Sequence, residues 1–209
     1  MVDFTAAFSF IGGAFFDWLK LFIAPLENLD MLWIIVPIWG VWIFSEFFQE
    51  KKGTSFGNAI TNGAVMLFVG VDWIRYTIRD MVAKGTGFGV ESATEIAISG
   101  FIILISVGII IMGIKGRSVV KLIGKAREST YILLMFTPII YGVVDFNFRT
   151  LGVILMFFPV FYILVEILDR VLPNPQTFEL EEGYRLDLAM GREADVISGL
   201  GDLGQGPFG

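Results

Sequence analysis

The chain has 209 residues, of which 55% are hydrophobic and only 17% are charged, where ordinary soluble domains are about a quarter charged. It contains neither Cys nor His, which excludes disulfides, thiolate nucleophiles, imidazole bases and the usual zinc and haem ligands. The formal charge of −6 disfavours nucleic acid as a partner. The sequence therefore predicts an all-α protein, a polytopic transmembrane helix bundle with five or six hydrophobic segments.

The first hydrophobic segment, 4–23, is long enough to cross a bilayer but carries a polar stripe. Small and polar residues recur in it at helical spacing: Ser9, Gly13, Asp17 and Lys20. Two arrangements fit this pattern. The helix either lies in the headgroup plane, or crosses the bilayer with its stripe turned inward and Asp17 paired to Lys20.

Four other segments are predicted to span. Segments 31–48 and 97–114 are almost entirely apolar and have 18 residues each, about the length that crosses the hydrocarbon. Segments 131–144 and 151–165 are shorter, so we interpret them as spans that borrow flanking apolar residues and are joined by a tight turn at 145–150.

The remaining segment, 59–76, carries the main candidate site. At 3.6 residues per turn, one stripe of its helix contains two amides, a carboxylate and a phenol: Asn58, Asn62, Val65, Val69, Asp72 and Tyr76. A carboxylate in a bilayer needs a partner or a water-filled path, and the nearest cations are Arg75 and Arg79. Small residues flank Asn62, so it is also expected to hydrogen-bond to another helix.

Ionisable residues at the edges of other segments form a second set of candidates: Asp17, Lys20, Asp145 and Arg149. For Asp145 and Arg149 we prefer the interpretation that they are solvated groups at helix ends. The run GTGFG at 85–89 looks superficially like a phosphate loop, but no Lys-Ser/Thr follows it and no strand precedes it. The sequence thus indicates no catalytic residue, cofactor or metal site, which favours a protein that is not an enzyme.

Lys and Arg in the short loops predict the orientation. If the crossings are counted in order, Lys51, Lys52 and the five cations of 115–127 fall on one side. Four cations fall on the other: Arg75, Arg79, Lys84 and Arg149. This excess predicts that 51–52, 115–127 and the C-terminus face the cytoplasm, with residues 1–170 integral to a cellular membrane, the plasma membrane being expected.

Residues 171–209 form the second predicted domain, an acidic tail that contains Gly and Pro. From 170 to 209 there are seven Asp or Glu against three Arg. Apolar residues alternate around Glu-Glu-Gly between 178 and 188, which is compatible with a β-hairpin. Because an isolated hairpin is marginal in water, the tail is a candidate contact for another protein.

Two functions remain open from the sequence, and it favours the first by a small margin. The first is a transport or channel-type component with a polar path along Asn58, Asn62 and Asp72. The second is a structural or accessory subunit of a larger membrane complex, in which the same groups satisfy helix contacts. Membrane lipids surround the chain in both cases, with further copies or other membrane subunits as partners. A lipid-modifying enzyme ranks third, because the carboxylates are scattered rather than clustered around a metal.

Overall fold

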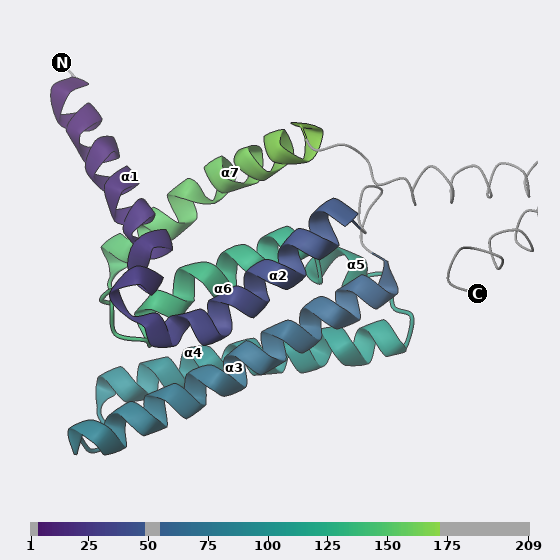
Figure 1. Cartoon of the computed structure of the whole chain (residues 1–209), viewed down its shortest axis with the longest axis horizontal. Helices are drawn as coiled ribbons and strands as arrows, with labels where there is room; N and C mark the ends of the chain where they lie inside the picture. The colour runs from purple at the N-terminus through teal and green to yellow at the C-terminus, as the bar shows by residue number, and fades with distance from the viewer. Residues whose placement is uncertain (1–3, 49–54, 172–209) are drawn as a thin grey trace, which may run out of the picture. The chain divides into compact units, whose positions relative to one another are not determined.

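The computed structural model describes residues 4–48 and 55–171, in which the chain forms α-helices, one short 3-10 helix and no strand (Figure 1). The predicted all-α class is confirmed for these residues. Their bounds are α1 Phe4–Glu27, η1 Leu29–Met31, α2 Leu32–Phe48, α3 Phe56–Lys84, α4 Val90–Ile114, α5 Val120–Ile123, α6 Ala126–Ile140 and α7 Phe148–Val171. The hairpin predicted between 178 and 188, and the acidic tail from 172 onward, lie outside the described residues.

Helices α3 and α4 form a long antiparallel hairpin (Figure 1). Its turn begins at Gly85, whose φ of +62° is in the left-handed region that favours glycine at a helix end. The two helices approach closely because glycines line their contact. A Cβ built on Gly70 would lie 2.7 Å from Cγ1 of Ile103, and one on Gly113 would lie 2.5 Å from Cγ1 of Ile60. Small residues at a contact are the usual means by which helices pack in a membrane.

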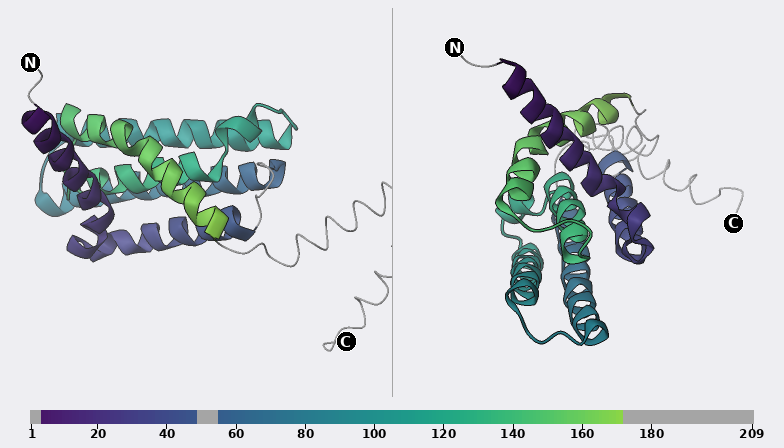
Figure 2. Two further views of the ribbon diagram at one scale, coloured as in Figure 1. Left: turned by 90° about the horizontal axis from the view of Figure 1, so that it is seen from above. Right: turned by 90° about the vertical axis from the view of Figure 1, so that its left-hand side faces the viewer.

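Helices α2, α3 and α6 contact one another, and aromatic side chains attach α1 and α7 to them. The rings of Trp18 on α1 and Phe157 on α7 stack with centroids 5.3 Å apart. The Tyr131 hydroxyl on α6 accepts a hydrogen bond from Trp18 Nε1 at 3.1 Å and donates one to the Ile154 carbonyl at 2.6 Å. These two buried hydrogen bonds join α1, α6 and α7. The axis of α1 is steeply inclined to that of α2 (Figures 1 and 2).

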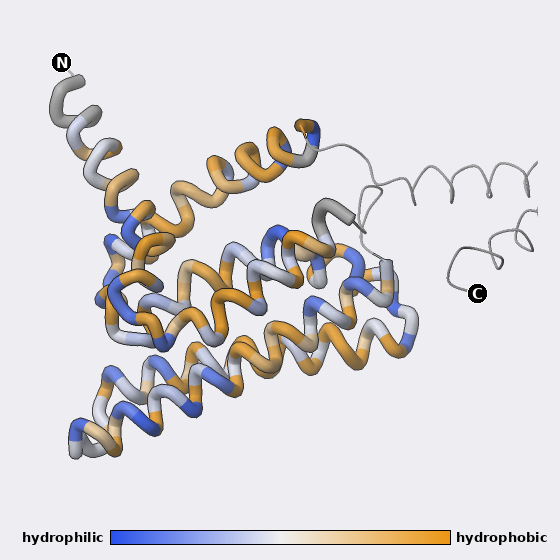
Figure 3. Tube along the Cα trace, viewed as in Figure 1, coloured by the Kyte–Doolittle hydropathy of each residue, from blue (hydrophilic) through white to orange (hydrophobic). Residues whose placement is uncertain are grey.

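Three helices among the described residues are long and apolar enough to cross a membrane: Ser9–Glu27, Val90–Ile114 and Phe148–Leu168. Among these residues, fewer helices than the five or six predicted spans are therefore long and apolar enough to cross by themselves. Helix α2 has 17 residues and α6 only 15, so both are short for a crossing. Helix α3 is long enough, but its amides and charges lower its hydropathy, and Figure 3 shows hydrophilic residues gathered on α3 and α4 near their connecting loop.

The connection between α6 and α7 also differs from the predicted turn at 145–150. Helix α6 ends at Ile140, and α7 begins at Phe148, inside that predicted turn. The early start of α7 has a local cause, since Oδ1 of Asn147 accepts a hydrogen bond from the Thr150 amide at 2.8 Å. The connection 141–147 consequently contains Tyr141, which is important for the candidate site.

Candidate functional site

The polar groups that the sequence places on one stripe of α3 have two different surroundings. Asn62 is buried, and its Nδ2 donates a hydrogen bond to the Gly124 carbonyl at 2.8 Å, in the link between α5 and α6. Asn58 is half-buried in the first turn of α3, where its backbone amide donates to the Ser55 hydroxyl. Asp72 lies ten residues beyond Asn62, or about 15 Å along the helix axis. The stripe thus serves two separate parts of the bundle.

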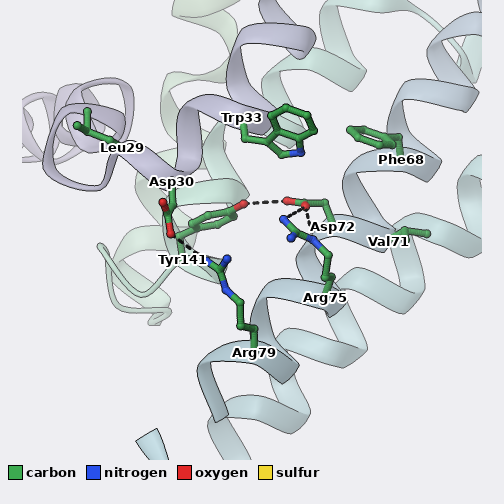
Figure 4. Close-up of a pocket in the computed structure, with 9 residues that line it drawn as sticks. All are labelled: Leu29, Asp30, Trp33, Phe68, Val71, Asp72, Arg75, Arg79 and Tyr141. Atoms are coloured by element: carbon green, nitrogen blue, oxygen red, sulfur yellow. Dashed lines mark hydrogen bonds and ion pairs between the residues drawn. The ribbon is translucent and has the colours of Figure 1, made fainter. Parts of the chain in front are cut away.

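Asp72 lies in the wall of a cavity of about 530 Å³, with only 4% of its side chain exposed (Figure 4). One carboxylate oxygen accepts a hydrogen bond from Nε of Arg75 at 2.9 Å, as the i,i+3 spacing suggests. The other accepts a hydrogen bond from the Tyr141 hydroxyl at 2.8 Å. Both oxygens of this buried carboxylate therefore have partners, and the second one joins α3 to the end of α6.

Tyr76 holds Tyr141 in place. The two rings are stacked with their centroids 3.8 Å apart, and the Tyr76 hydroxyl donates a hydrogen bond to the Tyr141 carbonyl at 3.3 Å. The structure thus brings Tyr76 and Asp72 of the predicted stripe into one cluster, one turn of α3 apart. Sequence reasoning missed Tyr141; its only signal was a phenol near the end of an apolar run, where a polar tip is commonly found.

Arg79 lies at the mouth of the same cavity but pairs with a different carboxylate. Its Nη2 lies 2.8 Å from Oδ2 of Asp30, a residue of η1 that the sequence analysis did not single out (Figure 4). The Arg75 and Arg79 side chains are 55% and 56% exposed. Two arginines and two aspartates therefore meet at the cavity with no net charge. The rest of its lining is apolar and comes from Leu29, Trp33, Phe68 and Val71.

The secondary candidates meet at a second cavity, of about 450 Å³. Its lining includes all four of them: Asp17, Lys20, Asp145 and Arg149. Asp17 pairs with Arg149 of α7 rather than with Lys20 of its own helix, and Nε of Arg149 donates to Oδ2 of Asp17 at 2.9 Å. This pair fixes α1 to the start of α7. Asp145 and Arg149 are exposed, as groups near helix ends commonly are.

Neither cavity holds the ligands of a metal site. Within 4–48 and 55–171, no group of three or more acidic side chains is placed to bind a metal ion. The arrangement can instead hold an amphiphile or join helices, because it combines paired charges with apolar walls. No family model, curated protein or solved structure matches the chain, so its own residues and geometry carry the functional argument.

Proposed function

We propose that the chain is a non-catalytic structural or accessory subunit of a larger membrane complex. The main support is that the two buried polar residues of the α3 stripe, Asn62 and Asp72, have partners inside the chain. Asn62 bonds to the Gly124 carbonyl, and Asp72 bonds to Arg75 and Tyr141. A group that handles a solute in the membrane has to face a water-filled path, whereas these groups join α3 to the α5–α6 link and to the end of α6.

Three of the buried hydroxyl groups support the same function. Ser99 and Ser106 on α4 donate to the carbonyls of Glu95 and Ile102, four residues back in the same helix, at 2.7 and 2.6 Å. Thr137 on α6 donates to its own helix and accepts a hydrogen bond from Trp73 Nε1 at 3.3 Å. Hydroxyls that are satisfied in this way need no water in the bundle, and the Thr137 hydroxyl also joins α6 to α3.

We place α2, α3 and α6 in the bilayer together with the three apolar helices, and the bilayer in the plasma membrane. Large apolar side chains on α2 and α3 are exposed, among them Val36, Phe68 and Val71, as lipid-facing residues would be. The excess of cations at 51–52 and 115–127 supports a cytoplasmic position for those loops and the C-terminus. Single Cys residues at positions 86 and 121 should then react with an impermeant reagent from opposite sides, and labelling from one side would refute this orientation.

The proposed partner contact is the acidic segment 172–209, which the subunit would offer to another protein in the cytoplasm. The test compares the tagged full chain with a chain ending at Val171, each purified in mild detergent from native membranes after crosslinking. We expect the full chain to carry a second membrane protein in stoichiometric amount, and the truncated chain to remain in the membrane without it. A full chain that elutes alone or only as a homo-oligomer contradicts the proposal.

A transport or channel-type component is the second candidate, because Asp72 lines a cavity of about 530 Å³. The variant Asp72→Asn, nearly isosteric but uncharged, separates the two functions. A transporter that uses this carboxylate loses flux while its stability changes little. A structural subunit loses stability, because the Asp72 contacts to Arg75 and Tyr141 weaken, and has no flux to lose.

A further inference from the structure

Two cavities between α2 and α3 follow one another along the same pair of helices. The cavity at Asp72 extends to Phe68. Phe68 also lines a smaller, separate cavity of about 250 Å³. This smaller cavity lies further along α2 and closer to the start of α3, between Pro37 of α2 and Ala64 and Val65 of α3. We call the two together the α2–α3 groove. It is apolar along most of its length and charged at one end.

One face of α3 lines the whole groove, since its residues recur every three or four positions: Thr61, Ala64, Phe68, Val71, Arg75 and Arg79. The part from Thr61 to Val71 is about 15 Å long, half of the roughly 30 Å hydrocarbon core and therefore comparable in length with an extended acyl chain. In the proposed bilayer placement of α3, Arg75 and Arg79 follow at the depth of the headgroups. Trp33, 66% exposed, lines the same cavity as these arginines (Figure 4), and aromatic residues are enriched at a membrane boundary.

The charged end of the groove presents both signs. Arg75 and Arg79 are more than half exposed, and so is Asp30, while the four charges that include Asp72 sum to zero. A zwitterionic headgroup finds partners for both of its charges here. An anionic headgroup would add an uncompensated charge, and a quaternary ammonium could not donate a hydrogen bond to Asp30.

We propose that the α2–α3 groove binds one phospholipid with a phosphoethanolamine headgroup. An acyl chain lies along the apolar part of the groove, the phosphate contacts Arg75 and Arg79, and the ammonium donates to Asp30. This inference rests on the proposed placement of α2 and α3 in the bilayer, and it goes beyond the proposed role as a subunit, since it assigns a ligand to the chain itself.

Native mass spectrometry of the detergent-solubilised full chain tests the inference. The chain is titrated with phosphatidylethanolamine, phosphatidylglycerol and phosphatidylcholine that carry the same acyl chains. We expect one bound phosphatidylethanolamine and about tenfold weaker binding of the other two, the usual effect of losing one charge-assisted hydrogen bond. Glycerophosphoethanolamine, which has the headgroup without acyl chains, should not compete. Equal binding of the three lipids, or competition by the soluble headgroup, overturns the proposal.

Substitutions at both ends of the groove make the test specific. Arg79→Gln should weaken phosphatidylethanolamine binding about tenfold, whereas Arg149→Gln, a similarly exposed arginine paired to Asp17 outside the groove, should not. Ala64→Phe should abolish binding by filling the apolar part, whereas Ala97→Phe, at an exposed position on α4, should not. Unchanged binding in Arg79→Gln or Ala64→Phe overturns the lipid site. Failure of the proposed placement of α3 looks different: single Cys residues at positions 52 and 86, before and after α3, would then react with an impermeant reagent from the same side.

Discussion

The two sides of α3 are built in opposite ways. Toward α4 the contact is closed, because Gly70 and Gly113 leave no room for a Cβ against Ile103 and Ile60. Toward α2 the contact is open, with the α2–α3 groove and a half-exposed Phe68 between the helices. One helix thus combines a rigid seam with an accessible groove. Substitutions on the closed side should therefore affect stability, and those on the open side should affect mainly what the groove holds.

The largest effect is expected on the closed side. Gly70→Val places a branched side chain where the Ile103 side chain and the Ser99 carbonyl already lie, so the free energy of unfolding should fall by about 3 kcal/mol. Denaturant unfolding of the detergent-solubilised chain measures this change. Gly100→Val is the matched control on α4, because nothing lies within 4 Å of a Cβ built there. Equal losses in both variants would show that the seam is not the cause.

A smaller loss is expected where the groove meets the bundle. Tyr141→Phe removes the hydroxyl that donates to the buried Asp72 carboxylate, so the free energy of unfolding should fall by about 2 kcal/mol. Tyr162→Phe is the control, since that residue is exposed on α7. If Tyr141→Phe is as stable as the unmodified chain, Asp72 is not a clamp between α3 and the end of α6.

A smaller loss of stability than for Tyr141→Phe is expected at Asn62, which contacts the link between α5 and α6. Asn62→Ala removes the donor to the Gly124 carbonyl and should lower the free energy of unfolding by about 1 kcal/mol. Asn58→Ala, at the half-buried start of the same helix, should change it less. Thermal unfolding of the two variants under identical conditions makes the comparison, and the reverse order would contradict the assignment of Asn62 to a helix contact.

The smallest effect belongs to the open side. Arg79→Gln breaks an ion pair whose two side chains are both more than half exposed, and such pairs contribute about 0 to 1 kcal/mol. The free energy of unfolding should therefore stay within that range of the unmodified value. A loss above 2 kcal/mol would mean that the Arg79–Asp30 pair holds the helices together, and that the two sides of α3 are less different than the structure indicates.

Sequence patterns found the parts of the site that are local in the chain. The Asp72–Arg75 pair follows from i,i+3 spacing on one helix, which the sequence displays directly. Tyr141 is 69 residues from Asp72 in the sequence, and Asp30 is 49 residues from Arg79. Their contacts therefore depend on how α6 and η1 pack on α3. For the same reason the sequence could name Asp17 and Arg149 separately but not their pairing.

The fold shows the same limit. Periodicity and composition predict helices throughout, and the described residues are helical almost everywhere. Fewer helices than predicted are long and apolar enough to cross by themselves, because the helices that contain most of the apolar runs 31–48 and 131–144 have only 17 and 15 residues. In α3, the amides and charges that mark the candidate site are the same residues that lower its hydropathy.

The most direct measurement on the proposed function is ion flux through the full chain and its Asp72→Asn variant in sealed vesicles of the same lipid. Proton and monovalent-cation fluxes are compared with protein-free vesicles, and unfolding of each protein is measured in parallel. We predict no flux above the protein-free level for either protein, together with a lower free energy of unfolding for the variant, because Asp72 joins α3 to Tyr141. A flux that the unmodified chain supports, and that a fully stable Asp72→Asn protein loses, would contradict the account.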